Sequence, residues 1–487
     1  MTQTPTRAAG PGAGTAGAAG AGESGAPGAT AVSAGSPAPL RRRTDWAGSV
    51  ARLRAAATTE PGRLRVIGAV LAVLVVAFGA VTAWQITDRQ AAAGHVIHRS
   101  APLSAKAAEI YRSLADADAT VTGGFLVGGQ QPAAVSKRYD DDIAHAASLI
   151  TEAAANSGDS AEARTQITAL NEQLPYYTRL VATAQADNRQ GLPLGGAYLR
   201  YANDQMRKKG GLLDAADKLY RAETARLGRD YGHAEALPWT AWVLGALALA
   251  ALVWAQRRHF RRTNRVFNRG MLAASGACAV VLVWLLVGHT LARTHLDDSY
   301  AHGAKSLQVL NSARISVLQA RGDENLTLVA RGSGEAYDAS FDSGMATLAG
   351  KDPAGVGGEL AQALSLADAR AGKDPVNAAI DGVRTWRGRH TAARRSDDGG
   401  DYTTAVADVI GGRNSAGQEV TQTTGQCFDA VDASLQQAIG QETREFQKAA
   451  GDGRDALSLL PFGAGLLAVL AAAGALVGIG RRLSEYR

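Results

Sequence analysis

The sequence predicts an all-α membrane protein with four transmembrane helices, two tandem extracytoplasmic four-helix bundles and a disordered N-terminal tail. Three observations lead to this fold class. Four long stretches contain no charged residue. Two large segments, each enclosed by a pair of these stretches, are rich in helix-forming residues and poor in strand formers. In both segments, apolar or small residues recur at steps of three and four, the period of a packed helix.

Each uncharged stretch is long enough to cross a bilayer. The stretches are residues 66–87, 236–256, 270–292 and 456–480. A hydrocarbon core of about 30 Å requires roughly 20 residues of helix. Tryptophans favour the headgroup level at the ends of such helices, and five of them lie near the ends of these stretches: Trp84, Trp239, Trp242, Trp254 and Trp284.

The N-terminal segment 1–60 precedes the first span. Its first 40 residues are almost all Ala, Gly, Pro, Ser and Thr. Such a composition cannot bury a hydrophobic core, so we expect a disordered tail. The tail lacks the early positive charge of a secretory signal, and we expect 66–87 to act as an uncleaved signal anchor.

Charge counting predicts the orientation in the membrane. Segments 1–65, 257–269 and 481–487 together hold 17 Lys and Arg against 4 Asp and Glu, a net charge of +13. Segments 88–235 and 293–455 hold 34 against 41, a net charge of −7. Basic loops stay in the cytoplasm. We therefore expect both termini and 257–269 inside, and the two large segments outside, in a multi-pass plasma-membrane protein.

The two outer segments show the same helical design. In the first, the seam residues are Ile110, Leu114, Ala117, Val121, Gly124 and Gly128, and in the second they are Ile315, Leu318, Gly322, Asn325 and Val329. Steps of three and four indicate packed helices. Gly- and Pro-containing breaks divide each segment into four expected helices, the last of which returns to the membrane as one long helix.

Short parallels between the segments indicate an internal duplication. Asp118 and Thr122 are four residues apart and are followed by a glycine, as are Asp323 and Thr327. The return helices also show matching Ala and Leu spacing. Each copy is expected to consist of a span, a helical bundle and a second span.

No motif of a known catalytic chemistry was found. The chain has no Gly-Lys-Ser/Thr phosphate loop, no Gly-x-Ser-x-Gly elbow and no His-Glu-x-x-His zinc motif. Cys278 falls in the third span and Cys427 in the second outer segment, so the two cannot pair. We expect no enzyme activity, no cofactor and no metal. The excess positive charge lies in the segments that are predicted to be cytoplasmic and is explained by the membrane topology. We therefore expect no binding of nucleic acid.

The stretch 319–332 is the densest polar stretch within a helical seam. Asn325 occupies a seam position, and a buried amide there can fix register and oligomeric state. Four charged residues surround it: Arg321, Asp323, Glu324 and Arg331. Two interpretations remain open, a set of surface salt bridges and a contact patch for a ligand or partner.

Six arginines lie in the short segment between the second and third spans: Arg257, Arg258, Arg261, Arg262, Arg265 and Arg269. One interpretation is that they set the topology and bind the anionic lipids of the inner leaflet. A second interpretation, compatible with the first, is that they dock a cytoplasmic partner.

Paired spans that enclose outer four-helix bundles resemble the sensory module of bacterial chemoreceptors. Two such modules in tandem, without an output domain, resemble the GlnX family of membrane transducers. The residues that carry the resemblance are 118–132, 318–334 and the four-span layout with its arginine segment. The resemblance implies two partners, a solute-binding lipoprotein similar to GlnH and a cytoplasmic Ser/Thr kinase similar to PknG, in an amino-acid sensing system.

The resulting hypothesis is a non-enzymatic transmembrane signal transducer, which relays an extracellular solute signal to a cytoplasmic Ser/Thr kinase. An envelope scaffold or assembly protein is the first alternative. A direct small-molecule receptor, with its ligand inside a bundle, is the second. Homodimerisation is possible in any of these cases, because sensory bundles of this kind often dimerise.

Overall fold

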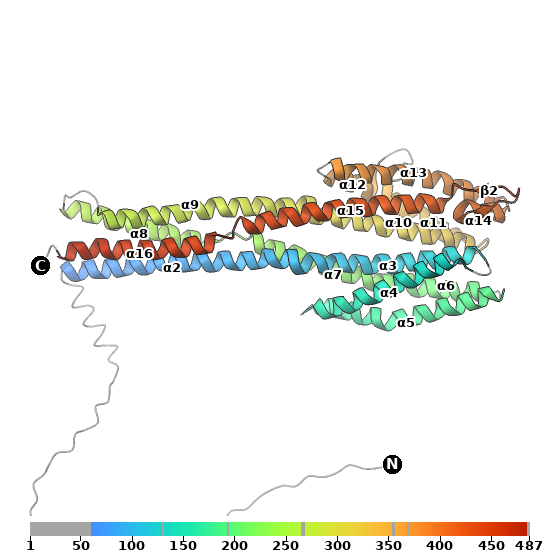
Figure 1. Ribbon diagram of the computed structural model, residues 1–487, viewed down its shortest axis with the longest axis horizontal. Coiled ribbons are helices and arrows are strands. Elements are labelled where there is room, and N and C mark those ends of the chain that lie inside the picture. The colour runs from blue at the N-terminus through green and yellow to red at the C-terminus, as the bar shows by residue number, and fades with distance from the viewer. Residues whose placement is uncertain are drawn as a thin grey trace, which may run out of the picture. The chain divides into compact units, whose positions relative to one another are not determined.

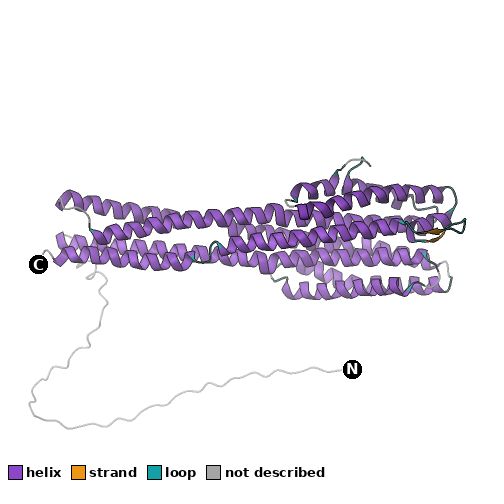
Figure 2. Cartoon of the chain, turned by 45° about the horizontal axis from the view of Figure 1, so that its top comes forward, coloured by secondary structure: helices purple, strands orange, loops and turns teal. Residues whose placement is uncertain are grey.

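The computed structural model describes residues 60–128, 131–158, 160–191, 194–263, 268–352, 356–367 and 370–484. The expected disordered tail lies outside these ranges, except for residue 60. Within them the chain is almost entirely helical, and the only strands are the short antiparallel pair β1 (Gly412–Arg413) and β2 (Glu419–Val420) (Figure 2). The all-α fold class predicted from the sequence is therefore confirmed.

Four helices are long and apolar enough to cross a membrane. Each of them contains one predicted span, and the apolar residues of these spans lie mainly in α2 (Glu60–His95), α8 (Trp239–Thr263), α9 (Arg269–Asp298) and α16 (Leu460–Ser484). These helices lie side by side at one end of the described unit (Figure 1). Their shared core includes Val75, Phe78 and Leu285, all at most 1% exposed. Apolar side chains such as Phe462 cover the outside, as expected for a surface that faces lipid.

Two of the membrane helices continue into the outer region without a break in the helical backbone. Helix α2 passes through the π-helix η1 (Val96–Ser100) into α3 (Ala101–Leu126). Helix α9 passes through the π-helix η2 (Ser299–Ala304) into α10 (Lys305–Val329). A π-helical turn holds one residue more per hydrogen-bonded ring than an α-helical turn, and such turns are frequent at functional sites. The two halves of the chain thus carry the same irregularity at the same place.

The first outer segment contains more helices than predicted. After α3 it forms α4 (Ala133–Asn156), α5 (Ala161–Arg189), α6 (Leu194–Arg207) and α7 (Leu212–Glu235). The sequence predicted α6 and α7 as parts of one long return helix. That prediction is wrong at residues 208–211, where Gly210 has a φ of +79°, a left-handed conformation that ends α6.

The second outer segment forms α10, α11 (Glu335–Ala349), α12 (Gly358–Leu366), α13 (Arg370–Asp398), α14 (Tyr402–Ile410), the hairpin and α15 (Thr424–Asp455). Helix α15 is the predicted long return helix. It begins with a capping box in which the Thr423 side chain accepts from the Gln426 backbone N–H, and the Gln426 side chain accepts from the Thr423 backbone N–H.

The two outer segments share one hydrophobic core. Helix α3 of the first segment packs directly against α10 of the second (Figure 1). The core contains Leu114 and Tyr177 from the first segment together with Val317 and Trp386 from the second, all completely buried. The two copies therefore do not form independent bundles, and a displacement of one is felt by the other.

Candidate functional site

A buried arginine connects the two outer segments. Arg207 ends α6 and reaches α10 and α3. Its Nε lies 3.4 Å from Asp118 Oδ2, and its Nη1 donates to Asp323 Oδ1. A Cβ atom at Gly322 would collide with this guanidinium, so glycine is required there for Arg207 to approach α10. Asp118 and Asp323 occupy equivalent positions in the predicted internal duplication.

Further hydrogen bonds hold the two carboxylates in place. Asn203 Nδ2 donates to Asp118 Oδ2 at 2.8 Å, and Tyr177 Oη donates to the other oxygen at 3.4 Å. Ser340 Oγ donates to Asp323 Oδ2 at 2.9 Å. The carboxylates belong to α3 and α10, which are the two helices that continue into the membrane, whereas the donors come from α5, α6 and α11.

The charge of this site is not balanced when both acids are ionised, because two carboxylates share one guanidinium. Burial raises the pKa of Asp118 and of Asp323, although Arg207 opposes the shift in both cases. The same two carboxylates raise the pKa of Arg207 against its own burial, so the arginine remains charged. Each of the two carboxyl groups therefore binds a proton more readily than it would in water.

Two further contacts join α3 to α10 near Arg207. Asn325 Nδ2 donates to the backbone oxygen of Ala119 at 3.1 Å. Gln319 Nε2 donates to Tyr111 Oη. Asn325 thus crosses between the segments, consistent with the register-fixing role expected of a buried amide at a seam position.

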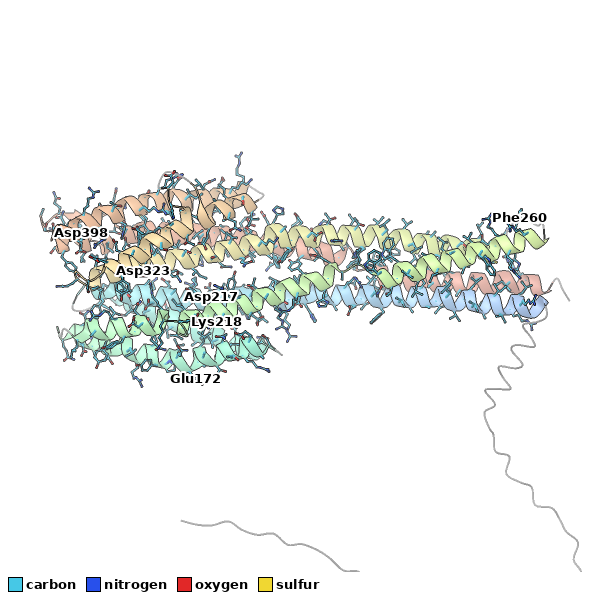
Figure 3. All side chains as sticks on the ribbon, turned by 180° about the vertical axis from the view of Figure 1, so that it is seen from behind. Glu172, Asp217, Lys218, Phe260, Asp323 and Asp398 are labelled. Carbon is cyan, nitrogen blue, oxygen red and sulfur yellow. The ribbon has the colours of Figure 1, made fainter. Side chains whose placement is uncertain are left out.

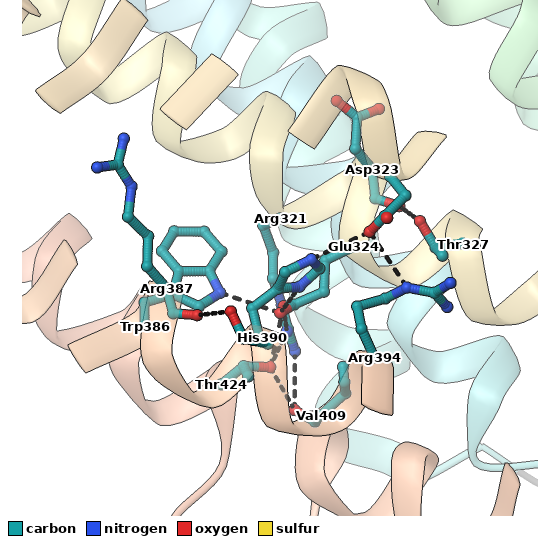
Figure 4. Close-up of polar contacts among 12 residues, drawn as sticks. Arg321, Asp323, Glu324, Thr327, Trp386, Arg387, His390, Arg394, Val409 and Thr424 are labelled. Carbon is teal, nitrogen blue, oxygen red and sulfur yellow. Dashed lines mark hydrogen bonds and ion pairs between the residues drawn. The ribbon is translucent and has the colours of Figure 1, made fainter. Parts of the chain in front are cut away.

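A second polar cluster lies inside the second outer segment, centred on Glu324 (Figure 4). One carboxylate oxygen accepts from Trp386 Nε1 at 3.1 Å and lies 3.0 Å from His390 Nδ1. The other accepts from Arg321 Nη1 at 2.7 Å and from Thr424 Oγ1 at 2.9 Å. Four donors from three helices therefore surround a carboxylate that is 1% exposed.

The cluster keeps both Glu324 and His390 ionised. Burial opposes the charged form of Glu324, but the hydrogen bond from His390 and the charge of Arg321 outweigh it and lower the pKa of Glu324. Burial likewise opposes a charged His390, but its hydrogen bonds to Asp338 and Glu324 raise its pKa to about 9. His390 also stacks on Phe341, with ring centroids 3.7 Å apart.

The predicted polar patch lies mostly in the interior. Arg321, Asp323, Glu324 and Asn325 are at most 9% exposed, so the interpretation as surface salt bridges is wrong for these four. Figure 3 shows Asp323 in the outer region, at the opposite end from Phe260 of α8. Arg331 lies apart from them at the end of α10, where its φ is +39° and its guanidinium lies 4.5 Å from the Tyr402 ring centre.

Sequence reasoning did not identify Arg207 or His390. Arg207 lies in a stretch that was read as a continuous helix, where its neighbours Lys208 and Lys209 make it look like part of a solvated basic run. His390 belongs to no sequence motif of known chemistry. The sequence does contain one indication of this cluster. His390 follows Trp386 by four residues, which places both side chains on one face of a helix.

The described parts of the arginine segment are mostly helical. Helix α8 extends to Thr263, so residues 257–263 are helical, and Arg269 begins α9. Arg257, Arg261 and Arg269 are exposed, and Arg258 lies over the Trp254 ring at 5.5 Å. The Arg262 side chain and Arg265 lie outside the described residues. Asn268, the N-cap of α9, donates through its Nδ2 to Gly478 O at 2.6 Å, which fastens the start of α9 to α16.

Among the residues that the structure describes, no group of three or more His, Cys, Asp or Glu side chains could hold a metal ion. Cys278 and Cys427 are both buried and unpaired. The polar clusters therefore consist of ion pairs and hydrogen bonds within and between helices.

These features define a helical protein with four apolar helices of membrane-spanning length and a large outer region, whose hydrophobic core contains buried polar clusters. Residues 92–232 match the model of the family described as the actinobacterial sensor domain. The match covers the end of α2 through α7, which is less than a third of the chain, and it indicates a sensor protein. The chain matches no curated protein and no solved structure at a significant level.

Proposed function

We propose that the protein is a transmembrane signal transducer, in which the outer region receives a solute signal through a solute-binding lipoprotein and the arginine segment passes it to a cytoplasmic Ser/Thr kinase. In this proposal the protein has no catalytic site of its own. The match of residues 92–232 to a sensor domain carries the proposal, because that domain is joined to the first span by continuous helix.

A group of polar contacts where the outer region meets the spans supports this proposal, and we call it the polar collar. Ser100 in η1 donates to Asp230, and Ser299 in η2 lies 2.7 Å from the hydroxyl of Tyr231. One return helix, α7, thus contacts both π-helical turns through neighbouring residues. On the other side, Arg454 of α15 lies 3.2 Å from His98 of η1. A small rotation of α7 would displace both entering helices together.

The route from the polar collar to the cytoplasmic face follows from the helix packing. Helices α2 and α9 both pack against α16, and Asn268 at the start of α9 is fastened to the same helix. A signal that shifts α2 or α9 relative to α16 would therefore change the presentation of Arg257, Arg261 and Arg269. The signal reaches the partner only if the partner binds more tightly to the shifted arrangement of these helices than to the unshifted one, or the reverse.

The orientation belongs to the same proposal, with both termini and the arginine segment in the cytoplasm. Fusions of a fluorescent protein that matures only in the cytoplasm, and of alkaline phosphatase, which is active only outside, test it. Insertion points are the arginine segment, the C-terminus and the loop at 350–358. We expect fluorescence at the first two and phosphatase activity at the third, and the reverse pattern would refute the orientation.

Affinity capture of the full-length protein from detergent-solubilised membranes, with mass spectrometry of the co-purified proteins, tests the proposed function. We expect a solute-binding lipoprotein and a Ser/Thr kinase. Recovery of only cell-wall or division proteins would refute the relay and favour an envelope scaffold.

A further inference from the structure

A cavity of about 490 Å³ lies between the two outer segments, at the end of α3 and α10 that is far from the membrane. Its walls come from α3, α4, α10, α14 and α15, so both segments contribute. Cavities of roughly 300–1,000 Å³ are of the size that binds small molecules. The cavity therefore has the size and the position of a site whose occupant would contact both halves of the sensory region.

Both positively and negatively charged side chains line the cavity. Arg138 of α4 lies 2.9 Å from Asp116 and 3.6 Å from Asp429 of α15. The second contact joins the two segments, but its side chains are 44% and 62% exposed, so it is a weak ion pair. The other arginine on the wall, Arg321, is already bound to Glu324 and Thr424.

One residue of the wall has a buried polar atom without a partner. Asn325 is 1% exposed and lines the cavity, and its Oδ1 has no hydrogen-bond donor. The amide orientation is fixed, because the backbone oxygen of Ala119 can only accept and must face the Asn325 NH₂ group. An unsatisfied buried acceptor costs about 1–3 kcal/mol, which a ligand N–H or O–H would recover.

We propose that this cavity binds a small zwitterion, which places its anionic group at Arg138 and its N–H donors toward Asp429 and Asn325. Such a ligand would replace the weak Arg138–Asp429 ion pair, because its anionic group can bind Arg138 while its cationic group binds Asp429. Arg138 keeps Asp116 as a partner when Asp429 is taken, but only a ligand with both charges replaces both halves of the lost Arg138–Asp429 pair. The proposal goes beyond the kinase relay, and the two can fail separately.

The test uses the full-length protein in nanodiscs and isothermal titration calorimetry with the standard L-amino acids as zwitterionic probes. For each binder, the decarboxylated amine and the deaminated acid serve as single-charge probes. We expect at least one amino acid to bind about tenfold more tightly than either analogue. Failure of every amino acid to bind at up to about 10 mM, or equal binding of a single-charge analogue, would overturn the proposal.

Substitutions of residues that line the cavity test whether the ligand binds there. Asp429→Ala removes an exposed side chain, and Asn325→Leu removes the free acceptor; each is expected to weaken binding about tenfold. Asp381→Ala on α13, which also breaks an exposed ion pair but lies outside the cavity, is the matched control and should bind like the wild type. Unchanged binding to a folded Asp429→Ala variant would overturn the proposal, even if Asn325→Leu fails to fold.

Discussion

Arg207 of α6 and Asp323 of α10 form an ion pair that crosses from the first outer segment to the second. Through the same guanidinium, Asp118 of α3 joins the pair. The two aspartates that are paired by the sequence parallels thus meet at one arginine. Because α3 and α10 are the outer continuations of two membrane helices, this contact fixes the position of one entering helix relative to the other.

Arg207→Ala should destabilise the protein by about 3 kcal/mol, because it leaves two buried carboxylates without their cation. Thermal unfolding in nanodiscs measures the effect. Arg221→Ala is the matched control, since its side chain is 77% exposed and pairs with Asp217 on the same helix. We expect the control to change stability by less than about 1 kcal/mol. Equal effects of the two substitutions would contradict the role assigned to Arg207.

Stability should fall as the pH rises through the pKa of His390. The folded protein raises this pKa from 6.5 to about 9, so the charged histidine stabilises the fold fully below pH 6.5 and progressively less up to about 9. The melting temperature between pH 6 and 9.5 measures the effect. In the His390→Gln variant, we expect the melting temperature to fall less steeply with pH, because the contribution of His390 is removed. An identical slope in a folded variant would show that other groups are responsible.

Deletion of Ile97 from η1 should leave the protein folded. A π-helical turn contains one residue more than the α-helix requires, so removal of one residue converts η1 into continuous α-helix without shifting the phase of α3. Deletion of Ala108, inside α3, is the control, because it rotates the seam residues Ile110 and Leu114 away from the core. Circular dichroism and thermal unfolding measure both. Equal disruption by the two deletions would contradict the inference that η1 contains one residue more than a continuous α-helix needs.

The sequence predicted the four spans and the helical fold because both depend on local composition and period. The first seam was correct at Ile110, Leu114, Ala117 and Val121, which are completely or almost completely buried, and wrong at Gly128, which is exposed beyond the end of α3. The second seam is less informative. Nearly every residue from 313 to 328 is buried, whether apolar or charged, because α10 packs against helices on several sides. A helix at the centre of a structure has no solvent-facing stripe from which its polar contacts can be read.

The candidate site depends on contacts that sequence spacing does not contain. Arg207 and Asp323 are 116 residues apart, and His390 and Glu324 are 66 residues apart. The stretch 319–332 could be recognised as unusual because it places charges in a helical seam. The partners that neutralise those charges come from α6, α13 and α15, and only the packing of the two segments brings them together.

The central claim is that the arginine segment passes a signal to a kinase. The most direct test replaces Arg257, Arg258, Arg261, Arg262, Arg265 and Arg269 by alanine and measures Ser/Thr phosphorylation in cells by quantitative phosphoproteomics. A variant with six lysines, which keeps the charge that directs topology, is the control for insertion. We predict that the alanine variant, once its correct insertion is verified, reproduces the phosphorylation pattern of cells that lack the protein. Wild-type phosphorylation in a correctly inserted alanine variant would contradict the claim.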